Sequence, residues 1–225
     1  ITIEILRRIG CLEGGSFAEF GPGDGMENNT LILKALGWKG FWVGGENLSI
    51  SSKTTEKFSF IMKFVTIKNI IELALKGKKD IKCNDLDVIS FDLDGNDLYL
   101  VDELLKNNFR PKLFIVEYNG KFPPPIKWSI TYNEKNIWDG SDYYGASLES
   151  FNELFEKNNY KLVCCNSHTG SNAFFIKKEF EELFEDVPKD INDIYVSPRY
   201  FLHNVYGSNS FSHNQSVKTI NKLFE

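Results

Sequence analysis

Acidic side chains gather at the ends of two apolar runs, and they are the residues of this sequence best suited to chemistry. The segment SFDLDGND carries Asp92, Asp94 and Asp97. The next apolar run ends in VEYN, which contains Glu117 and Asn119. A carboxylate can take a proton from a hydroxyl group, or hold a divalent cation that lowers the pKa of that hydroxyl. The sequence Asp-Gly-Asn-Asp also favours a turn followed by a helix N-cap, so we expect at least one of these acids to be a helix cap.

A second candidate site is the stretch EFGPGDG, where Gly21, Gly23 and Gly25 alternate shortly after Glu19. A dinucleotide fingerprint, G-x-G-x-x-G, needs a third glycine where this sequence has Met26, and a Walker A loop needs a GK[ST] that does not follow. The spacing therefore excludes both kinds of phosphate cradle. Alternating glycines instead let the backbone pass close beneath a bound ligand.

A histidine and a group of aromatic residues are weaker candidates. His168 lies in the short stretch NSHTGS and is the only histidine outside the polar tail. Its near-neutral pKa would suit a general base, although a histidine in a turn is more often a solvated bystander. The aromatic side chains could bind a sugar or planar acceptor, or form a small core that keeps a long loop ordered. They are Trp128, Tyr132, Trp138, Tyr143 and Tyr144.

Strands that alternate with helices must position these residues. Apolar runs predict strands at residues 16–20, 40–44, 58–65, 86–94 and 111–119, and helical periodicity predicts helices at residues 26–38, 66–77 and 96–108. This alternation indicates right-handed crossovers and a parallel sheet that is buried on both faces. Two final runs, 160–165 and 172–178, flank a short turn and predict an antiparallel hairpin at one edge. We therefore expect a doubly wound α/β fold with a mostly parallel, seven-stranded sheet.

One long segment interrupts this alternation. Residues 120–146 are rich in proline and aromatic residues, and loops of such length are usually functional or disordered. A helix at residues 147–159 should follow, with Ser147 as its cap and the acidic Glu149 in its first turn. The polar tail at residues 203–216 predicts a surface loop, followed by a weak final helix.

Composition narrows the class of protein. The 225 residues are 42% hydrophobic and 14% aromatic, which suits one well-packed domain over residues 1–225. With 26 basic and 31 acidic residues, the chain lacks the basic face that nucleic-acid binding requires. No apolar run approaches a membrane span. Four cysteines without CxxC spacing suggest reduced thiols and a cytoplasmic location, while a start at Ile1 leaves targeting open.

The order of the motifs resembles the class I S-adenosylmethionine-dependent methyltransferases, in particular their FkbM-type branch. The similar stretches are EFGPGDG, GWKGFWVGGE, MKFVTIKNI, VISFDLDGND and LFIVEYN, and the resemblance covers roughly residues 17 to 177. It implies S-adenosylmethionine as cofactor and O-methylation of a small hydroxylated, sugar-like acceptor. It also implies that residues 120–146 are a substrate-recognition insertion. No nucleic-acid or membrane partner is expected.

The resemblance also assigns roles in cofactor binding. Gly21, Gly23 and Gly25 would lie beneath the cofactor, with Asp92 beside it. Glu19 would meet the cofactor's cationic end, or else cap backbone amides of the glycine turn. Val65 and Thr66 would lie near the adenine, although Thr66 also suits the N-cap of the following helix.

One position departs from the family pattern. Class I enzymes usually have an acid directly after the second strand, where its oxygens accept hydrogen bonds from the ribose hydroxyls. Here Gly44 follows Val43, and the first acid is Glu46. A bulge at the double glycine would bring Glu46 back to the ribose. Without it, the ribose hydroxyls lose that partner.

For a methyl transfer of this kind, the candidates for the catalytic base are Asp92, Asp94, Glu117 and His168. O-methyltransferases with metal sites build them from acids and an amide at these two strand ends, which Asp92, Asp94 and Asn119 resemble. A divalent metal is thus an open alternative to direct proton removal. Two other functions also stay open. One is a methyltransferase-like binding module with weak or no catalysis, and the other is a metal-dependent hydrolase on a related sheet.

Overall fold

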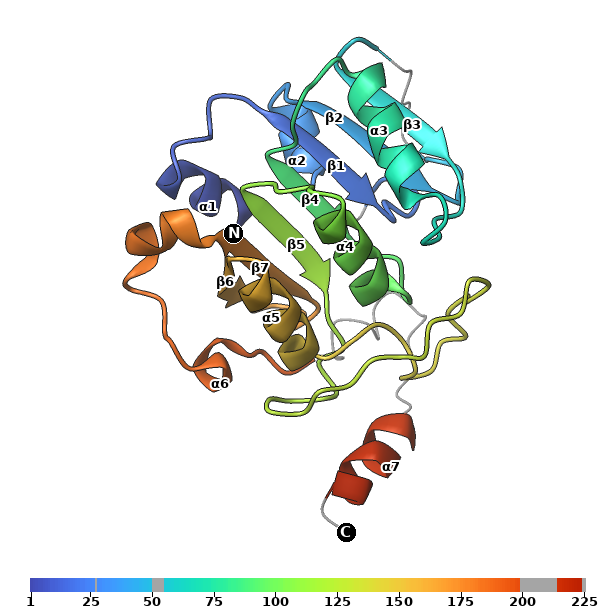
Figure 1. Ribbon diagram of the computed structural model, residues 1–225, viewed down its shortest axis with the longest axis vertical. Coiled ribbons are helices and arrows are strands. Elements are labelled where there is room, and N and C mark those ends of the chain that lie inside the picture. Colours follow the sequence, from blue (N-terminus) through green and yellow to red (C-terminus); the bar gives the residue numbers. More distant parts are fainter. Residues whose placement is uncertain (27, 50–54, 199–213, 224–225) are drawn as a thin grey trace.

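Seven strands form one mixed sheet in the computed structural model, which describes residues 1–26, 28–49, 55–198 and 214–223. The strand order is β3-β2-β1-β4-β5-β7-β6 (Figure 1). Strands β3, β2, β1, β4 and β5 are parallel, and β7 is antiparallel to both β5 and β6. The strands are β1 (Ser16–Phe20), β2 (Lys39–Gly44), β3 (Phe58–Met62), β4 (Val88–Phe91), β5 (Leu113–Glu117), β6 (Tyr160–Cys165) and β7 (Asn172–Lys177).

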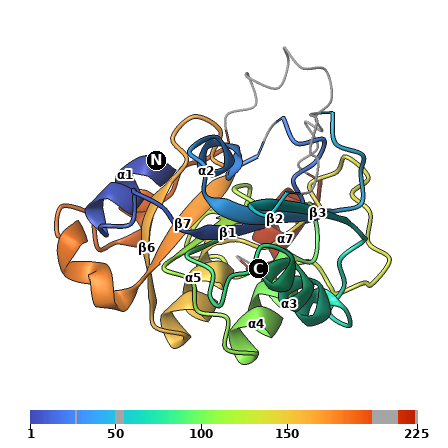
Figure 2. The same cartoon turned by 90° about the horizontal axis from the view of Figure 1, so that it is seen from above.

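Helices cover both faces of the sheet. Figure 2 shows α3, α4 and α5 on one face and α1 and α2 on the other. The helices are α1 (Thr2–Arg8), α2 (Leu31–Ala35), α3 (Ile70–Asp80), α4 (Asp97–Lys106), α5 (Leu148–Lys157), the 3-10 helix η1 (Lys178–Phe184), α6 (Ile191–Ile194) and α7 (Asn214–Leu223). The architecture is thus the three-layer, doubly wound arrangement that the sequence predicts.

Strand β1 shows why the strands read as nearly continuous apolar runs. All five of its residues are buried. Ala18 and Phe20 pack into the core beneath α3 and α4, while Phe17 packs into the separate core on the opposite face. Because successive side chains of a strand point to opposite faces, a strand covered on both sides needs apolar residues at every position. Glu19 is the one charged residue of β1, and it is fully buried.

The predicted strands, the edge hairpin and the helix capped by Ser147 are all confirmed. The Ser147 side chain accepts a hydrogen bond from the backbone N–H of Ser150. No helix in the described part of the chain is both long and apolar enough to cross a membrane. No disulfide joins the four cysteines. The predicted tail loop falls mostly on residues 203–213, which lie outside the described residues, and α7 follows it.

Two predicted helices begin later than expected. The helix expected at 26–38 is only α2, because the side chain of Asn28 accepts hydrogen bonds from the N–H groups of Thr30 and Leu31 and so holds a turn there. The helix expected from residue 66 begins at Ile70, so Thr66 is not its N-cap. The N–H of Thr66 instead donates to the side chain of Asn69.

The predicted bulge before Glu46 is wrong. Strand β2 pairs with β1 and β3 without a shift in register, and its pairing continues to Gly44. Glu46 therefore follows two residues after the end of a regular strand, and its side chain is exposed.

Candidate functional site

The glycine turn begins where β1 ends. Gly21 has a φ of +88°, and a Cβ there would lie 1.8 Å from the backbone oxygen of Asp92. Only glycine fits this contact between the ends of β1 and β4. Gly23, with a φ of +53°, has no atom within 4 Å of the place its Cβ would take. Gly21 is thus needed for close packing, whereas Gly23 leaves open space above the turn.

Glu19 lies below this turn and is surrounded by hydrogen-bond donors. Its carboxylate accepts from the N–H groups of Asn29 and Thr30, and from the hydroxyls of Thr30 and Ser90. The Thr30 hydroxyl in turn accepts from the indole of Trp42 at 2.9 Å. Burial raises the pKa of Glu19, and the hydrogen bond from Thr30 opposes that shift. Capping of backbone amides, one of the two predicted roles, is therefore present, although the amides belong to the start of α2 rather than to the glycine turn.

A cleft of about 890 Å³ opens above the glycine turn at the carboxyl ends of the parallel strands. Its lining includes Gly21, Gly23, Gly44, Gly45 and Val65. The charged residues of the lining are Asp24, Glu46, Lys63, Asp92 and Asp94. The cleft thus brings together five of the predicted cofactor-binding residues: Gly21, Gly23, Glu46, Val65 and Asp92. Gly25, which has a φ of +89°, shapes the turn beside it.

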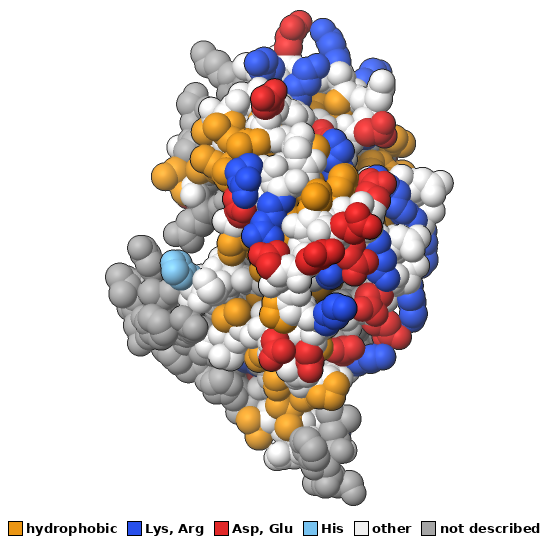
Figure 3. All heavy atoms as spheres, turned by 90° about the vertical axis from the view of Figure 1, so that its left-hand side faces the viewer, with side chains coloured by type: hydrophobic (Ala, Val, Ile, Leu, Met, Phe, Trp, Pro, Cys, Tyr) orange, Lys and Arg blue, Asp and Glu red, His pale blue; other side chains and the backbone are white. Residues whose placement is uncertain are grey.

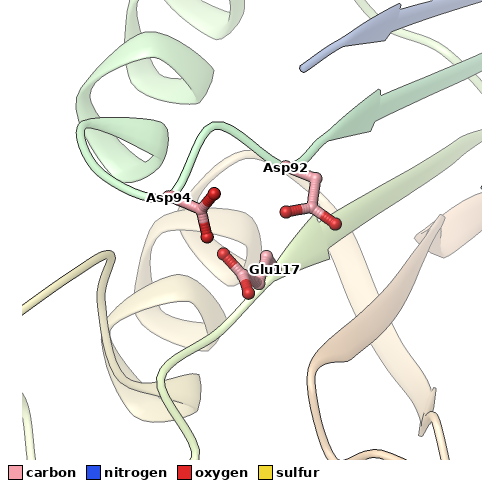
Figure 4. Close-up of side chains that lie close together, drawn as sticks. All are labelled: Asp92, Asp94 and Glu117. Carbon is pink, nitrogen blue, oxygen red and sulfur yellow. The ribbon is translucent and has the colours of Figure 1, made fainter. Parts of the chain in front are cut away.

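The acidic cluster lies at the edge of this cleft. Asp92 follows β4, Asp94 lies in the loop after it, and Glu117 is the last residue of β5. One carboxylate oxygen from each lies within 4.8 Å of the others, and all three side chains are half-buried. Figure 4 shows the three carboxyl groups pointing toward one another. Three oxygen ligands at this spacing suit a divalent cation in kind and number.

Burial and mutual repulsion raise the pKa values of these three acids. For Asp92 and Glu117, burial is the larger cause of the raised pKa, followed by the nearest carboxylates. Burial, with the charges of Asp97 and Glu46, raises the pKa of Asp94 to about 6. Such a cluster can accept a proton near neutral pH, or exchange its protons for a cation.

Asp97 has a structural role, but it is not the helix cap that we expected, because the N-cap of α4 is Asn96. It is fully buried at the first position of α4. Its carboxylate accepts hydrogen bonds from the N–H groups of Leu93 and Gly95, at 2.9 and 3.0 Å. These bonds fix the loop that carries Asp94, which has a positive φ of 51°. Asp97 therefore positions the acidic cluster.

Asn119 and His168 are not brought into the acidic cluster. The side-chain amide of Asn119 donates to the backbone oxygens of Asp142 and Tyr144, and its oxygen accepts from the N–H of Lys121. Glu117, rather than Asn119, joins Asp92 and Asp94. His168 is exposed in the β6–β7 turn, where its backbone N–H donates to the side-chain oxygen of Asn166.

The insertion at residues 120–146 lies beyond the carboxyl end of β5 (Figure 1). Part of it forms the small aromatic core that was one of the two predicted roles. Phe122 stacks on Trp128 with ring centroids 4.0 Å apart, and Tyr143 meets Trp128 edge-on. A different part, which includes Trp138, lines the cleft. One stretch of the insertion thus forms a small aromatic core, and another stretch lines the cleft, where it could contact a ligand.

Several lining residues of the cleft have no local signal in the sequence. Asn136 and Ile137 come from the insertion, and Phe64 follows β3. These residues reach the cleft only because segments about 40 to 70 residues apart in the sequence contact one another. No short motif predicts such long-range contacts. Lys63 and Phe64 could have been suspected from their position directly after a strand.

On the face shown in Figure 3, acidic and basic side chains are interspersed.

No protein-family model matches the sequence, and no curated protein matches it. Solved structures with a similar fold include magnesium protoporphyrin IX methyltransferase from Synechocystis PCC 6803 with bound SAM, at 12% identity and a TM-score of 0.45, over 78% of this chain and 76% of that one. MycE from the mycinamycin pathway, with Mg and SAH, matches at 12% identity and a TM-score of 0.45, over 92% and 55% of the two chains.

A third match is CalO1 from calicheamicin biosynthesis, with SAH bound, at 10% identity and a TM-score of 0.42. It covers 73% of this chain and 49% of CalO1, so this chain spans about half the length of CalO1 and of MycE. These similarities are too low to transfer an activity, a ligand or a substrate to the chain.

Proposed function

We propose that this chain is a class I S-adenosylmethionine-dependent methyltransferase of the FkbM type, which methylates a hydroxyl group of a small, sugar-like acceptor. The observation that carries the proposal is the charge of the cleft above the glycine turn. Among the described lining residues, Asp24, Glu46, Asp92 and Asp94 are acidic and Lys63 is the only cation. A cleft of this charge favours a cationic ligand over a phosphate-bearing one such as NAD or ATP.

S-adenosylmethionine fits this cleft in charge and in size. It carries a sulfonium and an ammonium group against one carboxylate, so its net charge is positive. A cavity of about 890 Å³ lies in the range of small-molecule sites. The open space above Gly23 lets a ligand approach the backbone closely. Glu19, by contrast, has its oxygens occupied by internal donors, so its proposed part is to hold the turn as well as to attract the ligand's ammonium group.

The proposed reaction needs an aligned acceptor and a place for its proton. The cofactor supplies an electrophilic methyl group when it is bound. Asp92 and Asp94, at the edge of the cleft, would accept the proton of the acceptor hydroxyl, with the carboxyl group of Glu117 close to both. The same three carboxylates would hold a divalent cation if the enzyme uses one. Glu46, Val65 and Thr66 remain proposed contacts for the nucleoside, and His168 remains a proposed second base.

A binding module without catalysis is the second candidate. The observation that favours it is Glu46, which is exposed two residues beyond β2 and so lacks the fixed position of the usual ribose-binding acid. Such a protein would bind the adenosyl ligand weakly and transfer no methyl group.

Calorimetric titration with S-adenosylhomocysteine, S-adenosylmethionine, NAD and ATP tests the proposal. We expect binding of the two adenosyl ligands and none of the two phosphate-bearing ligands. Transfer of a labelled methyl group to a panel of sugars and other small alcohols then separates an enzyme from a binding module. Binding of NAD, without binding of either adenosyl ligand, would refute the methyltransferase proposal.

A further inference from the structure

We propose that residues 136–138 of the insertion form a wall of the cofactor cleft and bind the nucleoside of the adenosyl ligand. This inference rests on the proposed function and deepens it. The insertion would then have two parts, of which only one is free to serve the acceptor. Asn136, Ile137 and Trp138 line the same cleft as Gly23, Glu46 and Val65, although they lie more than 70 residues further along the chain.

Three sets of contacts hold the adjoining stretch of the insertion over this end of the sheet. The side chain of Asn96 donates to the backbone oxygen of Asn133 at 2.8 Å and accepts from its N–H at 3.2 Å. The ring of Tyr132 packs edge-on against Tyr99, with centroids 5.5 Å apart. These contacts fix residues 132 and 133 to the start of α4, directly before the proposed wall.

The third set joins the insertion to the segment between β3 and α3. The N–H of Ile67 donates to the hydroxyl of Tyr132, and Lys68 forms an ion pair with Glu134 at 2.7 Å. This segment follows Val65, which also lines the cleft. The insertion therefore bridges the loops after β3 and β4, and the residues that follow this bridge, 136–138, line the cleft.

Four large apolar side chains line the cleft and are partly or largely exposed. Ile137 is 81% exposed, Met26 56% and Phe64 48%, and the half-buried Trp138 completes the group. These four residues come from the glycine turn, the segment after β3 and the insertion. Large apolar side chains that gather from separate segments around one cleft indicate a ligand with an apolar or planar part that covers them. In an adenosyl ligand that part is the adenine ring.

Trp138 is held in a defined orientation. Its indole N–H donates to the backbone oxygen of Ser141 at 2.7 Å, and its ring meets that of Tyr144 edge-on. A ring held in this way loses little freedom when a ligand packs on it, so the contact contributes more to binding. The remaining aromatic residues of the insertion, Phe122, Trp128 and Tyr143, pack on one another. They therefore offer a matched control within the same segment.

The test compares ligand binding by three variants, each with a folded-state check by circular dichroism and thermal melting. Trp138→Ala and Ile137→Ala change the proposed wall, and Tyr143→Ala changes an exposed aromatic residue that is not among those lining the cleft. The probes are S-adenosylhomocysteine and methylthioadenosine, which lacks the amino-acid part. We expect Trp138→Ala to weaken binding of both probes by about tenfold, from the loss of buried apolar contact. Tyr143→Ala should change neither.

The outcomes separate this inference from the proposed function. If the wild-type protein binds both probes and Trp138→Ala and Ile137→Ala bind them equally well, the wall is wrong and the proposed function stands. A loss for S-adenosylhomocysteine alone would place the wall at the amino-acid part and overturn the assignment to the nucleoside. If the wild-type protein binds no adenosyl ligand, the proposed function fails, and the inference fails with it.

Discussion

The carboxyl groups of Asp92 and Glu117 face each other across the ends of the neighbouring strands β4 and β5, with an oxygen of each within 4.8 Å of the other. Burial and the nearby acids raise the pKa values of both groups. Two carboxylates this close repel each other unless one is protonated or a cation lies between them. The pair is therefore suited to take up a proton or a cation at the edge of a cleft rich in carboxylates.

The first prediction concerns pH and Asp94. An acid whose pKa is higher in the folded than in the unfolded protein destabilises the fold as it ionises. The protonated form of Asp94 therefore favours the folded state. This contribution to the free energy of unfolding is fully present below pH 3.8, the usual pKa of an aspartate, and is lost as the pH rises through the folded-state pKa of about 6. Asp94→Asn should therefore raise the melting temperature above pH 6 by about 2–4 °C, or ~1 kcal/mol after allowance for solvent exposure. Thermal melts from pH 4 to pH 8 measure this.

Asparagine is the right replacement because it tolerates the positive φ of position 94. Asp24→Asn is a control of opposite sign. Hydrogen bonds from Met26 and Ser49 lower the pKa of Asp24, so the ionised Asp24 stabilises the folded protein. This contribution to the free energy of unfolding is present at neutral pH and is lost as the pH falls. A stability difference for Asp94→Asn that does not vary with pH would contradict the prediction.

The second prediction separates Gly21 from Gly23. Gly21→Ala places a methyl group against the backbone of Asp92 at a strained φ and should cost about 3 kcal/mol or more. Gly23→Ala meets open space and should cost only about 1–2 kcal/mol of backbone strain. Gly23→Leu should keep the fold but fill the cleft and abolish binding of S-adenosylhomocysteine. Chemical denaturation and calorimetry measure the two effects, and equal destabilisation by the two alanine variants would refute the distinction.

The sequence predicts the sheet well because each of the parallel strands is buried on both faces and reads as an apolar run. It predicts α2 poorly, since the side chain of Asn28 forms a turn where the apolar spacing suggests a helix. It also identifies Asp92, Asp94 and Glu117 at the two strand ends, but it offers Asn119 rather than Glu117 as the third metal ligand. Strand β5 ends at Glu117, and the chain then turns, so Asn119 lies in the insertion's hydrogen-bond network. The proposed wall at 136–138 depends on the bonds between Asn96 and Asn133, which only the folded chain reveals.

The third prediction tests the structural role of Asn119. Asn119→Asp replaces an amide that donates to two backbone oxygens with a group that repels them, in a fully buried position. We expect destabilisation of about 2–4 kcal/mol, measured by denaturant titration. Asn47→Asp, at an exposed position, should change stability by less than about 0.5 kcal/mol. An Asn119→Asp variant of unchanged stability would contradict this structural role.

The last prediction addresses how the acidic cluster acts on the acceptor. Asp92→Asn and Asp94→Asn should each lower methyl transfer by about 10²–10⁴-fold, the usual range for loss of a positioned base. Thr169→Ala, outside the cluster, is the control, and it should leave transfer unchanged. If the cluster holds a cation, a chelator should stop transfer reversibly, and Mg²⁺ or Mn²⁺ should restore it and raise the melting temperature of the wild-type protein but not of Asp92→Asn.

If the cluster instead takes the proton itself, transfer should persist in chelator and should rise with pH as the raised carboxyl pKa values are passed. Glu117→Gln separates the two cases further, because glutamine has the size and neutral charge of a protonated glutamate but is a weaker ligand for a cation. The Glu117→Gln variant should keep most of the methyl-transfer activity if the cluster accepts the proton directly. It should lose most of this activity if the cluster holds a metal ion. Unchanged transfer in both Asp92→Asn and Asp94→Asn would show that the cluster is only a structural turn, and would leave Glu117 and His168 as the remaining candidates for the base.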